Sequence, residues 1–511
     1  MPAEGFFAIA RAEPDRPALV DPAEATSTFG ELLDDADRVV AAFRSLGLAA
    51  GDTIAVALPN SRQFVVAYAA AIRAGLVFVP VNWHLTGPEI AYIVENSEAK
   101  LLVSHERFAP ALAVAGAALD PSRRFAVGAV EGYRPFEELL AGDTSEQQET
   151  VPGGLVMFYT SGTTGRPKGV RKRITLPPDA PIGLATGIGV PVPAADDGTA
   201  LVGGPLYHGN PLAAMAMALD AGQRLVLMER WTPEGFLRLV ERYRVTNAVM
   251  VPTMFHRLLA LPDEVRLAAD VSSLRRVMHG GAPCPIDTKR RMIEWLGPIL
   301  VEGYSSTEGA GTLVTSEEWL ARPGTVGRPS PGVTLKILDD DGHECPTGTP
   351  GRVFVSQALW QFEYLGDEEK TRANRVGDLF TVGDIGYVDD EGYLFLCDRV
   401  ADVIVSGGVN IYPAEVEGVL LEHPAVGDAA VVGAPNDEWG EEVRAVVEPR
   451  AGVAADDALA ADIIRFCRDR LAHYKCPVAV DFVDSLGRDP NGKLRKQVLR
   501  DRYWAGRTRR I

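Results

Sequence analysis

Short apolar runs alternate with longer amphipathic stretches along most of the chain. The run at residues 53–58 (TIAVAL) predicts a strand, residues 62–73 (RQFVVAYAAAIR) predict a helix, and residues 76–80 predict a second strand. Thr232 and Pro233 predict the start of another helix, because threonine caps a first turn and proline fits in it. Further strands are predicted at 224–228, 248–251 and 275–278. Strands that alternate with helices in this way build mostly parallel sheets flanked by helices.

The pattern changes in the second half of the chain. Residues 324–355 are rich in proline, glycine and short alternating runs, which predict antiparallel strands and hairpins. After Arg399, about 110 residues mix predicted helices and strands, enough for a separate domain. The sequence therefore predicts an α/β fold with a large N-terminal domain, residues 1–399, and a small α+β C-terminal domain, residues 400–511. The large domain combines mostly parallel sheets and flanking helices with a β-rich subdomain.

Composition and charge narrow the functional classes. The chain has 511 residues, of which 46% are hydrophobic and 23% charged, and its formal net charge is -18. Nonspecific nucleic-acid binding needs a basic surface and is not expected here. We find no signal peptide and no apolar run long enough to span a membrane, and the five cysteines are scattered. We therefore expect a cytoplasmic protein with reduced thiols.

A polar stretch follows the apolar run at residues 155–158 (LVMF), which predicts a buried strand. Residues 159–170 (YTSGTTGRPKGV) crowd hydroxyl side chains and glycines around Lys168. Glycine lets the backbone approach a ligand, and successive N–H groups can form an anion-binding nest. The stretch therefore predicts a polyphosphate cradle at the carboxyl end of a strand, where ligands bind in parallel sheets. It lacks the Walker A spacing and, taken alone, is equally typical of a surface turn.

The same stretch resembles the signature of the adenylate-forming superfamily, which includes acyl-CoA synthetases, peptide-synthetase adenylation domains and beetle luciferases. Among these, the chain is closest in pattern to bacterial fatty-acyl and steroid-acid CoA synthetases. Further motifs match in the same order over most of the chain, namely PLYHGN (205–210), HGGAP (279–283), GYSSTEG (303–309), TVGDIGY (381–387), DRVADVIVSGGVNIYPAEVE (398–417) and PNGKLRK (490–496).

The resemblance implies an acid–thiol ligase. In this family the carboxylate of the substrate attacks the α-phosphate of ATP, which gives an acyl-adenylate and pyrophosphate, and a thiol then displaces AMP. The implied cofactors are ATP, Mg²⁺ and coenzyme A, and the implied partner is a small carboxylic acid. The resemblance also allows a homodimer. The sequence contains no GxSxG elbow that would indicate a side-chain nucleophile.

Four residues match the catalytic positions of the family. Glu308 matches the glutamate that binds Mg²⁺, a hard cation that prefers carboxylate ligands. Thr307 matches a hydroxyl that contacts phosphate, and His208 matches the gate of the acyl tunnel. Lys493 matches the lysine that reaches the carboxylate and the α-phosphate. Because Lys493 belongs to the small domain, the resemblance implies a mobile domain that closes on the large one.

The resemblance also implies a nucleotide site and a coenzyme A passage. Tyr304 matches a ring packed on adenine, Asp384 the acid that holds the ribose hydroxyls, and Arg399 its partner. Gly407 and Gly408 match the loop beside which pantetheine passes. The full set expected to contact ATP or AMP is Thr160, Ser161, Gly162, Thr163, Thr164, Gly165, Lys168, Gly280, Gly281, Ala282, Glu302, Gly303, Tyr304, Ser305, Ser306, Asp384 and Arg399.

Two positions depart from the family pattern. Ala401 stands where the family usually has Asp or Lys as the hinge of the small domain; a small residue can still absorb a backbone rotation. Ahead of Gly492 and Lys493, residues 487–491 (GRDPN) lack the usual Arg-Thr pair. We expect adenylation to survive both changes, and the hinge change bears on the thioester step.

Small residues dominate the segments that match the family's acyl pocket. Small walls leave volume, so we expect a bulky apolar acid: long-chain, polycyclic, steroid-like or terpenoid. The residues expected to line this pocket are Tyr207, His208, Gly209, Met254, Gly280 and Gly309.

Three alternatives to a CoA ligase remain open at this point. The first is an acyl-AMP ligase that passes the acyl group to a separate carrier protein. The second is an oxidoreductase of luciferase type, which uses the same adenylate. The third is a nucleotide-binding module without enzymatic activity, although Lys493 and the whole phosphate loop would then have no purpose.

Overall fold

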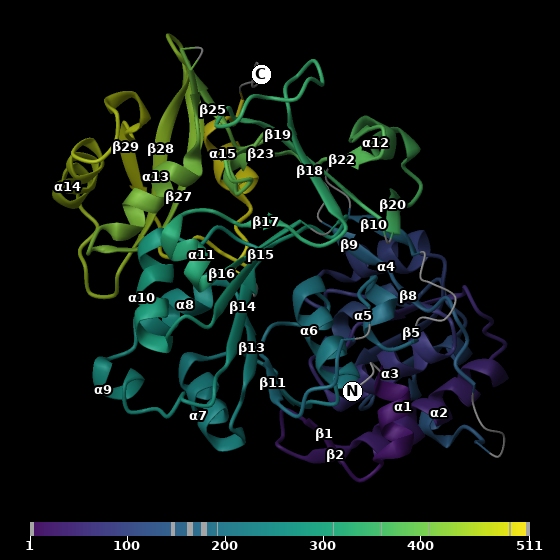
Figure 1. Ribbon diagram of the computed structural model, residues 1–511. Helices are drawn as coiled ribbons and strands as arrows, with labels where there is room; N and C mark the ends of the chain where they lie inside the picture. Colours follow the sequence, from purple (N-terminus) through teal and green to yellow (C-terminus); the bar gives the residue numbers. More distant parts are fainter. Residues whose placement is uncertain are drawn as a thin grey trace.

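A parallel sheet of six strands forms the first layer of the computed structural model (Figure 1). Its strands, in spatial order, are β7 (Arg134–Pro135), β6 (Arg124–Val127), β5 (Ala99–His105), β3 (Thr53–Val56), β4 (Val77–Pro80) and β8 (Leu155–Val156). The structure describes residues 5–144, 149–160, 167–174, 181–191, 193–309, 311–358, 360–407, 409–489 and 492–506. The strands predicted at 53–58 and 76–80 are confirmed as β3 and β4, with slightly shorter bounds.

A sheet of nine strands forms the second layer. Its strands, in spatial order, are β17 (Arg328–Pro329), β16 (Thr312–Thr315), β15 (Leu300–Tyr304), β14 (Arg276–Gly280), β13 (Asn247–Met250), β11 (Thr199–Val202), β12 (Arg224–Leu227), β1 (Pro17–Val20) and β2 (Thr26–Thr28). The six strands from β15 to β1 are parallel, and the edge strands β2, β16 and β17 are antiparallel. The parallel strands β14 and β15 therefore end side by side, at Gly280 and Tyr304.

Helices lie between the two sheets and on their outer faces. One hydrophobic core joins both sheets through the helices α1 (Gly5–Ala12), α2 (Phe29–Ser45), α3 (Arg62–Arg73) and α6 (Gly209–Asp220). The bounds of α3 are those that the amphipathic pattern predicts, and Ser61 caps its first turn. The outer face of the six-stranded sheet packs on α4 (Gly87–Asn96) and α5 (Ala109–Ala115). The outer face of the nine-stranded sheet packs on α7 (Pro233–Tyr243), α8 (Pro252–Leu259), α10 (Ile286–Leu296) and α11 (Ser316–Ala321).

The sequence predicts one strand at residues 155–158, and this prediction is wrong, because the run belongs to two strands. It divides at Met157: β8 closes the parallel sheet, whereas β9 (Phe158–Thr160) pairs antiparallel with β10 (Lys168–Ile174). The predicted phosphate loop is therefore the connection of a β-hairpin, with Thr160 and Lys168 paired at its two ends. A strand predicted from apolarity alone cannot show this change of sheet, because partner choice depends on distant residues. Here β20 (Trp360–Tyr364) completes the small sheet on the other side of β10.

A further antiparallel sheet confirms the predicted hairpins of the second half of the chain. It contains β21 (Arg375–Val376), β22 (Leu379–Phe380), β19 (Gly351–Gln357), β23 (Asp384–Val388), β24 (Leu394–Arg399) and β18 (Val333–Leu338). The short helix α12 (Glu368–Ala373) lies between β20 and β21 in the sequence.

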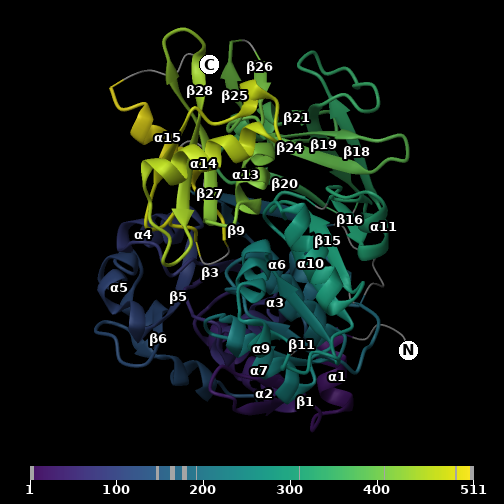
Figure 2. The same ribbon diagram turned by 90° about the vertical axis from the view of Figure 1, so that its left-hand side faces the viewer.

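The residues after β24 form a compact group of elements, which we call the C-terminal unit (Figure 2). Its elements are β25 (Ile404–Ser406), β26 (Val409–Ile411), α13 (Pro413–Glu422), β27 (Val426–Asn436), β28 (Gly440–Pro449), α14 (Asp457–Arg468), β29 (Ala479–Phe482) and α15 (Lys496–Tyr503). Its five strands make a sheet of their own with a separate core. Both ribbon views show the unit at the top of the molecule, above the two large sheets. The α/β fold class is thus confirmed.

Among the helices of the described residues, none combines the length and the apolar character needed to cross a membrane.

Candidate active site

The turn of the C-terminal unit that carries Lys493 lies against α8, a helix of the large part of the molecule. A Cβ atom at Gly492 would be 2.4 Å from Thr253 Oγ1, so the glycine packs directly on the first turn of α8. The Lys493 amide donates to Asp489 Oδ1 at 2.9 Å, which shapes the turn that presents the lysine. The Lys493 side chain is open to solvent, yet the walls around it desolvate the ammonium and lower its pKa, and the charge of Arg399 lowers it further.

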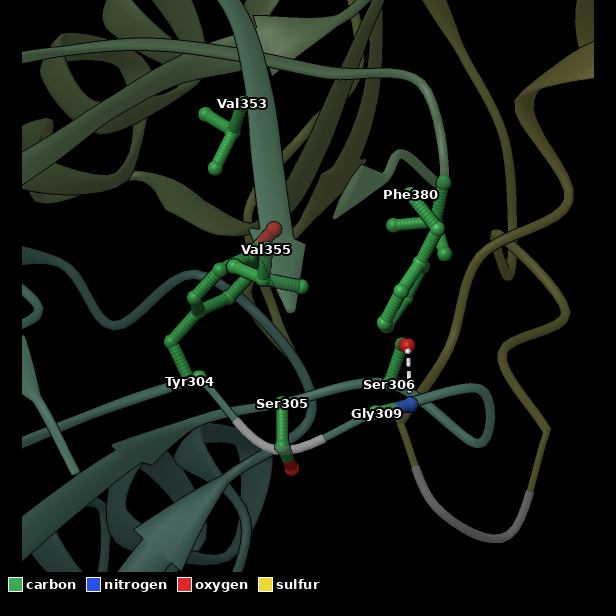
Figure 3. Close-up of a pocket in the computed structure, with 9 residues that line it drawn as sticks. Tyr304, Ser305, Ser306, Gly309, Val353, Val355 and Phe380 are labelled. Atoms are coloured by element: carbon green, nitrogen blue, oxygen red, sulfur yellow. Dashed lines mark hydrogen bonds between the residues drawn. The ribbon is translucent and has the colours of Figure 1, made fainter. Parts of the chain in front are cut away.

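Glu308 lies at the tip of a tight turn after β15. The Gly309 amide donates to Ser306 Oγ at 3.1 Å and closes the turn, as Figure 3 shows, so that Thr307 and Glu308 stand at its tip. The Glu308 carboxylate is 7% exposed and accepts a hydrogen bond of 2.9 Å from the Tyr364 hydroxyl. Its charge raises the pKa of Lys493, which brings these two predicted catalytic residues into one site.

Asp384 joins Tyr304 and Arg399 in a second cluster. The Tyr304 hydroxyl donates to Asp384 Oδ2 at 2.6 Å, and Arg399 Nε donates to Asp384 Oδ1 at 3.2 Å. Asp384 begins β23 and Arg399 ends β24, and the two residues are paired across these strands. Burial raises the pKa of Tyr304, and the neighbouring Asp384 raises it further. The structure therefore brings together three residues that the sequence places 80 and 15 positions apart.

The described ends of the predicted phosphate loop are Thr160 and Lys168. Ser161, Gly162, Thr163, Thr164 and Gly165 lie outside the described residues. Lys168 makes an ion pair with Asp367, whose side chain also caps α12. Lys370, on α12, lies 5.1 Å from the centre of the Tyr364 ring.

The ends of β14 and β15 approach each other closely. A Cβ atom at Gly280 would lie 2.2 Å from the Gly303 carbonyl oxygen, so the close approach requires glycine there. Gly281 follows with φ +81°, a conformation that favours glycine. Glu302 differs from its neighbours, because its carboxylate is buried and paired with Lys289 Nζ at 2.6 Å. Only its main chain remains for a nucleotide.

Tyr304, Ser305, Ser306 and Gly309 line a small cavity of about 10 Å³, together with residues of the neighbouring β-rich sheet (Figure 3). The ring of Phe380 fills the space beside Gly309, where a Cβ atom would be 2.1 Å from Cζ. This cavity holds about one water molecule and is too small for a substrate. Gly309 therefore adds little volume to an acyl pocket.

Tyr207 and His208 precede α6 and are in ring contact, with centroids 4.4 Å apart. Within the described residues, the Tyr207 hydroxyl and His208 Nε2 are buried without a hydrogen-bond partner. Burial lowers the pKa of His208 to about 3, and the charges of Lys493 and His84 lower it further, so the imidazole is neutral at working pH. Met254 is buried on α8, whereas Gly209 has no atom within 4 Å of a Cβ position.

The last predicted residues are Ala401, the expected hinge, and Gly407 and Gly408, the expected coenzyme A loop. The Ala401 carbonyl accepts a hydrogen bond of 2.7 Å from Arg500 Nη1 on α15. The Gly407 amide donates to the Trp439 carbonyl at 2.8 Å, and Gly407 has φ +58°. Gly408 lies outside the described residues.

Sequence reasoning missed several residues of this site. Tyr364 bonds to Glu308 but lies in a strand without a recognised motif. Asp367 and Lys370 lie just beyond it. Lys172 is buried in β10 although it belongs to the basic run KGVRKRI. The period of two along a strand could have identified Lys172, since it shares a face with the apolar Val170.

Known proteins match this arrangement over the whole chain. The sequence model of the family described as AMP-binding enzyme matches residues 6–364, and that of the AMP-binding enzyme C-terminal domain matches residues 415–493. A fatty acid–[acyl-carrier-protein] ligase of Streptomyces coeruleorubidus is 32% identical over 98% of this chain and 96% of its own. A long-chain-fatty-acid–CoA ligase of Mycobacterium tuberculosis is 32% identical over 97% of both chains. The structure of o-succinylbenzoate CoA synthetase from Bacillus subtilis with its acyl-adenylate intermediate superposes with a TM-score of 0.79, at 27% identity and 99% coverage of both chains.

Proposed function

The chain belongs to the family of AMP-binding enzymes and is an acid–thiol ligase that uses ATP and coenzyme A; from this premise we propose that it activates a bulky apolar carboxylic acid. The acid is first joined to AMP and then transferred to the thiol of coenzyme A. The observation that carries the proposal is the position of Lys493. It reaches from the C-terminal unit into a site where its charge interacts with those of Glu308 and Arg399 and lowers the pKa of His208.

In the first step, a carboxylate oxygen of the acid attacks the α-phosphorus of ATP, the bond to the β-phosphate oxygen breaks, and pyrophosphate leaves. Both reactants are anions, so the site must offset their repulsion and hold them in line. The Lys493 ammonium supplies positive charge where the two anions meet. His208 is neutral and adds no charge, which suits a residue at the mouth of an acyl channel.

The residues around Glu308 fit a divalent cation. Its carboxylate is buried, is positioned by Tyr364, and is a hard ligand of the kind that Mg²⁺ prefers. A bound Mg²⁺ would neutralise phosphate charge there. Thr307, at the tip of the same turn, presents a hydroxyl to the phosphates.

The proposal extends to the remaining nucleotide contacts, which the positions of the described residues support. Asp384 accepts hydrogen bonds from the ribose hydroxyls. Arg399 and Tyr304 hold its carboxylate in place. The strand ends at 280–282 and 302–306 border the adenine, and Glu302 contributes through its main chain. Thr160 and Lys168 bring the predicted phosphate loop to the triphosphate.

In the second step, the thiolate sulfur of coenzyme A attacks the acyl carbon and AMP leaves with the bond electrons. We propose Ala401 as the hinge on which the domain of residues 400–511 turns away from the domain of residues 1–399 between the steps. Gly407 and Gly408 would then border the pantetheine arm, because only glycine leaves room for a chain beside the backbone.

The acid class rests on the pocket walls that remain open. Gly209 and Gly281 have free space at their Cβ positions, with the nearest atom at Gly281 3.8 Å away. Met254 supplies an adaptable apolar wall. Gly280 and Gly309 do not widen the pocket, because a carbonyl oxygen and the Phe380 ring lie against them. The volume for a bulky acid is therefore expected between α6 and the end of β14.

A second function has one observation in its favour. The similarity to a fatty acid–[acyl-carrier-protein] ligase makes a carrier protein the alternative acceptor. Ala401 stands where the family usually has Asp or Lys as the hinge. This change affects the transfer of the acyl group to a thiol, because that step requires the hinge motion.

Pyrophosphate release, measured with acetate, benzoate, a long-chain fatty acid and a sterol acid, tests the proposal. We expect the long-chain or sterol acid to be preferred, and acyl-CoA to form at a rate comparable to pyrophosphate release. A preference for acetate would refute the substrate class. Acyl-AMP that accumulates while coenzyme A stays free would favour the carrier protein.

A further inference from the structure

Asn60 is a buried amide in the segment that joins β3 to α3, and it is 4% exposed. Its side chain bonds to the main chain of two distant segments. Nδ2 donates to the Gly204 and Met228 carbonyl oxygens at 2.9 Å each, and Oδ1 accepts from the Leu206 amide at 2.8 Å. An asparagine side chain has two N–H donors and one oxygen, so each of these groups has a partner in the protein. Asn60 therefore acts on a ligand only through the main chain that it holds.

The bonds of Asn60 join the carboxyl ends of strands from both large sheets. Asn60 follows β3 of the six-stranded sheet, whereas Gly204 and Met228 follow β11 and β12 of the nine-stranded sheet. Ligands of parallel sheets bind beyond strand ends of this kind. Leaving a buried carbonyl or amide group unpaired costs about 1–3 kcal/mol, so these bonds strongly favour one arrangement. Asn60 therefore sets the relative position of the two sheets at these strand ends.

The segment at residues 203–206 leads directly to Tyr207 and His208. Asn60 bonds to two residues of this segment, and the ring of Trp231 packs against its first residue, a glycine with no room for a Cβ atom. The helix α6 begins at the residue after His208. The main chain is thus held before the two rings by Asn60 and after them by a helix. The rings therefore keep one place relative to the strand ends.

Tyr207 and His208 present polar atoms that the protein does not pair. Tyr207 is 5% exposed, and within the described residues neither its hydroxyl nor His208 Nε2 has a hydrogen-bond partner. The ring of Trp83 meets that of Tyr207 edge to face at 6.0 Å, and its Nε1 is unpaired in the same way. Buried polar groups normally have partners. A group of unpaired atoms on neighbouring rings therefore favours a ligand as the missing partner.

We propose that Asn60 is a positioning residue for the carboxylic acid, because it holds residues 203–206 so that Tyr207 and His208 meet the acid in one orientation. The inference rests on the proposed adenylation activity and adds to it a residue from the other large sheet. A displacement of 1 Å in a site can cost on the order of 100-fold in rate. Loss of Asn60 therefore acts on the acid, whereas the proposed contacts of ATP lie on other segments.

The test compares Asn60→Ala and Asn60→Asp with Thr246→Val as a matched control. Asn60→Asp keeps the volume of the side chain but has no N–H donor, so an effect that both variants share comes from the lost bonds and not from a cavity. The buried Thr246 hydroxyl bonds to the amide and the carbonyl of Thr199, at the start of β11. The control therefore removes buried hydrogen bonds at the opposite end of the strand that leads to residues 203–206. Thermal unfolding reports the folding of each variant, and Asn60→Ser replaces any Asn60 variant that does not fold.

Pyrophosphate release gives the KM for the best acid of the panel above and the KM for ATP. We expect both Asn60 variants to raise the KM for the acid by roughly tenfold and to leave the KM for ATP at the wild-type value. Thr246→Val should lower the unfolding temperature and change neither KM. Equal changes in both KM values, a change in kcat alone, or an effect on the acid that Thr246→Val shares overturns the inference. Absence of pyrophosphate release from the wild type with every acid overturns the proposed function itself.

Discussion

The Tyr364 hydroxyl donates to a carboxylate oxygen of Glu308 at 2.9 Å. This bond links β20, a strand of the small antiparallel sheet, to the turn that follows β15 of the nine-stranded sheet. Tyr364 is 6% exposed, and burial raises its pKa, as do the charge and hydrogen bond of Glu308. The hydroxyl therefore stays protonated and remains a donor, which holds one oxygen of the Glu308 carboxylate in place.

Replacing Tyr364 by Phe should weaken the site without unfolding the protein. The variant leaves one oxygen of a buried carboxylate without its donor, and a hydrogen bond to a charged group contributes about 1.5–3 kcal/mol. We expect pyrophosphate exchange to fall about tenfold and to need more Mg²⁺. Tyr393→Phe is the matched control, because Tyr393 makes the same kind of bond to Glu318 at 3.1 Å. Equal Mg²⁺ dependence in both variants would contradict the role of Tyr364.

Replacing Lys493 by Ala should remove most of the adenylation activity. In the proposed mechanism the ammonium stabilises the charge that develops on the phosphate, and loss of one such contact costs on the order of 10²–10³-fold in rate. Exchange of labelled pyrophosphate into ATP measures this step alone. Lys336→Ala is the control, because Lys336 is paired with Glu344 at the surface. Turnover in Lys493→Ala within a few-fold of wild type would remove Lys493 from the mechanism.

The sequence draws attention to site residues that lie in motifs, but not to residues elsewhere in the chain that form hydrogen bonds with them. Glu308, Asp384 and Lys493 stand in recognisable stretches, and the structure gathers them in one region. Tyr364 has no such stretch, and its bond to Glu308 depends on the pairing of β20 with β10. That pairing joins residues about 190 positions apart, for example Val170 and Tyr364. Local patterns carry no information about partners at this distance.

Lys172 shows a second limit of sequence reasoning. A lysine in the run KGVRKRI is usually solvated, and only the period of two along the strand, which places Lys172 on the face of the apolar Val170, indicates that it is buried. The helix at 62–73 shows the opposite case, since amphipathic periodicity and a serine cap determine both of its ends. Strands β8 and β9 are an intermediate case of prediction. Their apolar residues predict that they are buried, but do not predict which sheet each strand joins.

The stability of the region around α1 should depend on Asp220. This carboxylate is 1% exposed and accepts amide hydrogen bonds from Phe6, Leu184 and Ala185. Burial raises its pKa to about 6. Since the folded pKa lies above that of the unfolded chain, the folded state binds more protons between pH 4 and pH 6. The contribution of this group to stability therefore falls as pH rises through that window, by about 3 kcal/mol.

Asp220→Asn tests this pH dependence, because the amide resembles the protonated acid and does not titrate. The unfolding temperature of the variant, relative to wild type, should rise from pH 4 to pH 6 and stay level above it. Glu24 provides the opposite comparison: Arg238 lowers its pKa, so Glu24→Gln should lose stability relative to wild type as pH rises through the acid range. A constant difference between wild type and Asp220→Asn across pH 4–7 would contradict the raised pKa.

The contact between Gly492 and Thr253 should control the position of Lys493. Gly492 has φ +76°, and a Cβ atom there would lie 2.4 Å from Thr253 Oγ1 and 2.7 Å from Cγ2. Gly487, in the same segment, has φ +67° but no atom within 4 Å. Alanine at either position therefore carries a similar backbone strain of about 1 kcal/mol, and only Gly492→Ala also displaces the turn. We expect Gly492→Ala to reduce pyrophosphate exchange by about tenfold to a hundredfold, since a displacement of 1 Å can cost that much.

A double variant separates the contact from the strain. Thr253→Ala removes both side-chain atoms that a Cβ at position 492 would meet most closely, and leaves the Thr253 Cβ position at 3.1 Å. The double variant Gly492→Ala/Thr253→Ala should therefore recover most of the lost pyrophosphate exchange. Its remaining loss should equal the loss seen in Gly487→Ala. Coupling of this kind is expected only between residues in contact. If Gly492→Ala and Gly487→Ala lose activity equally, or if Thr253→Ala restores nothing, the Lys493 turn does not need α8 for its alignment.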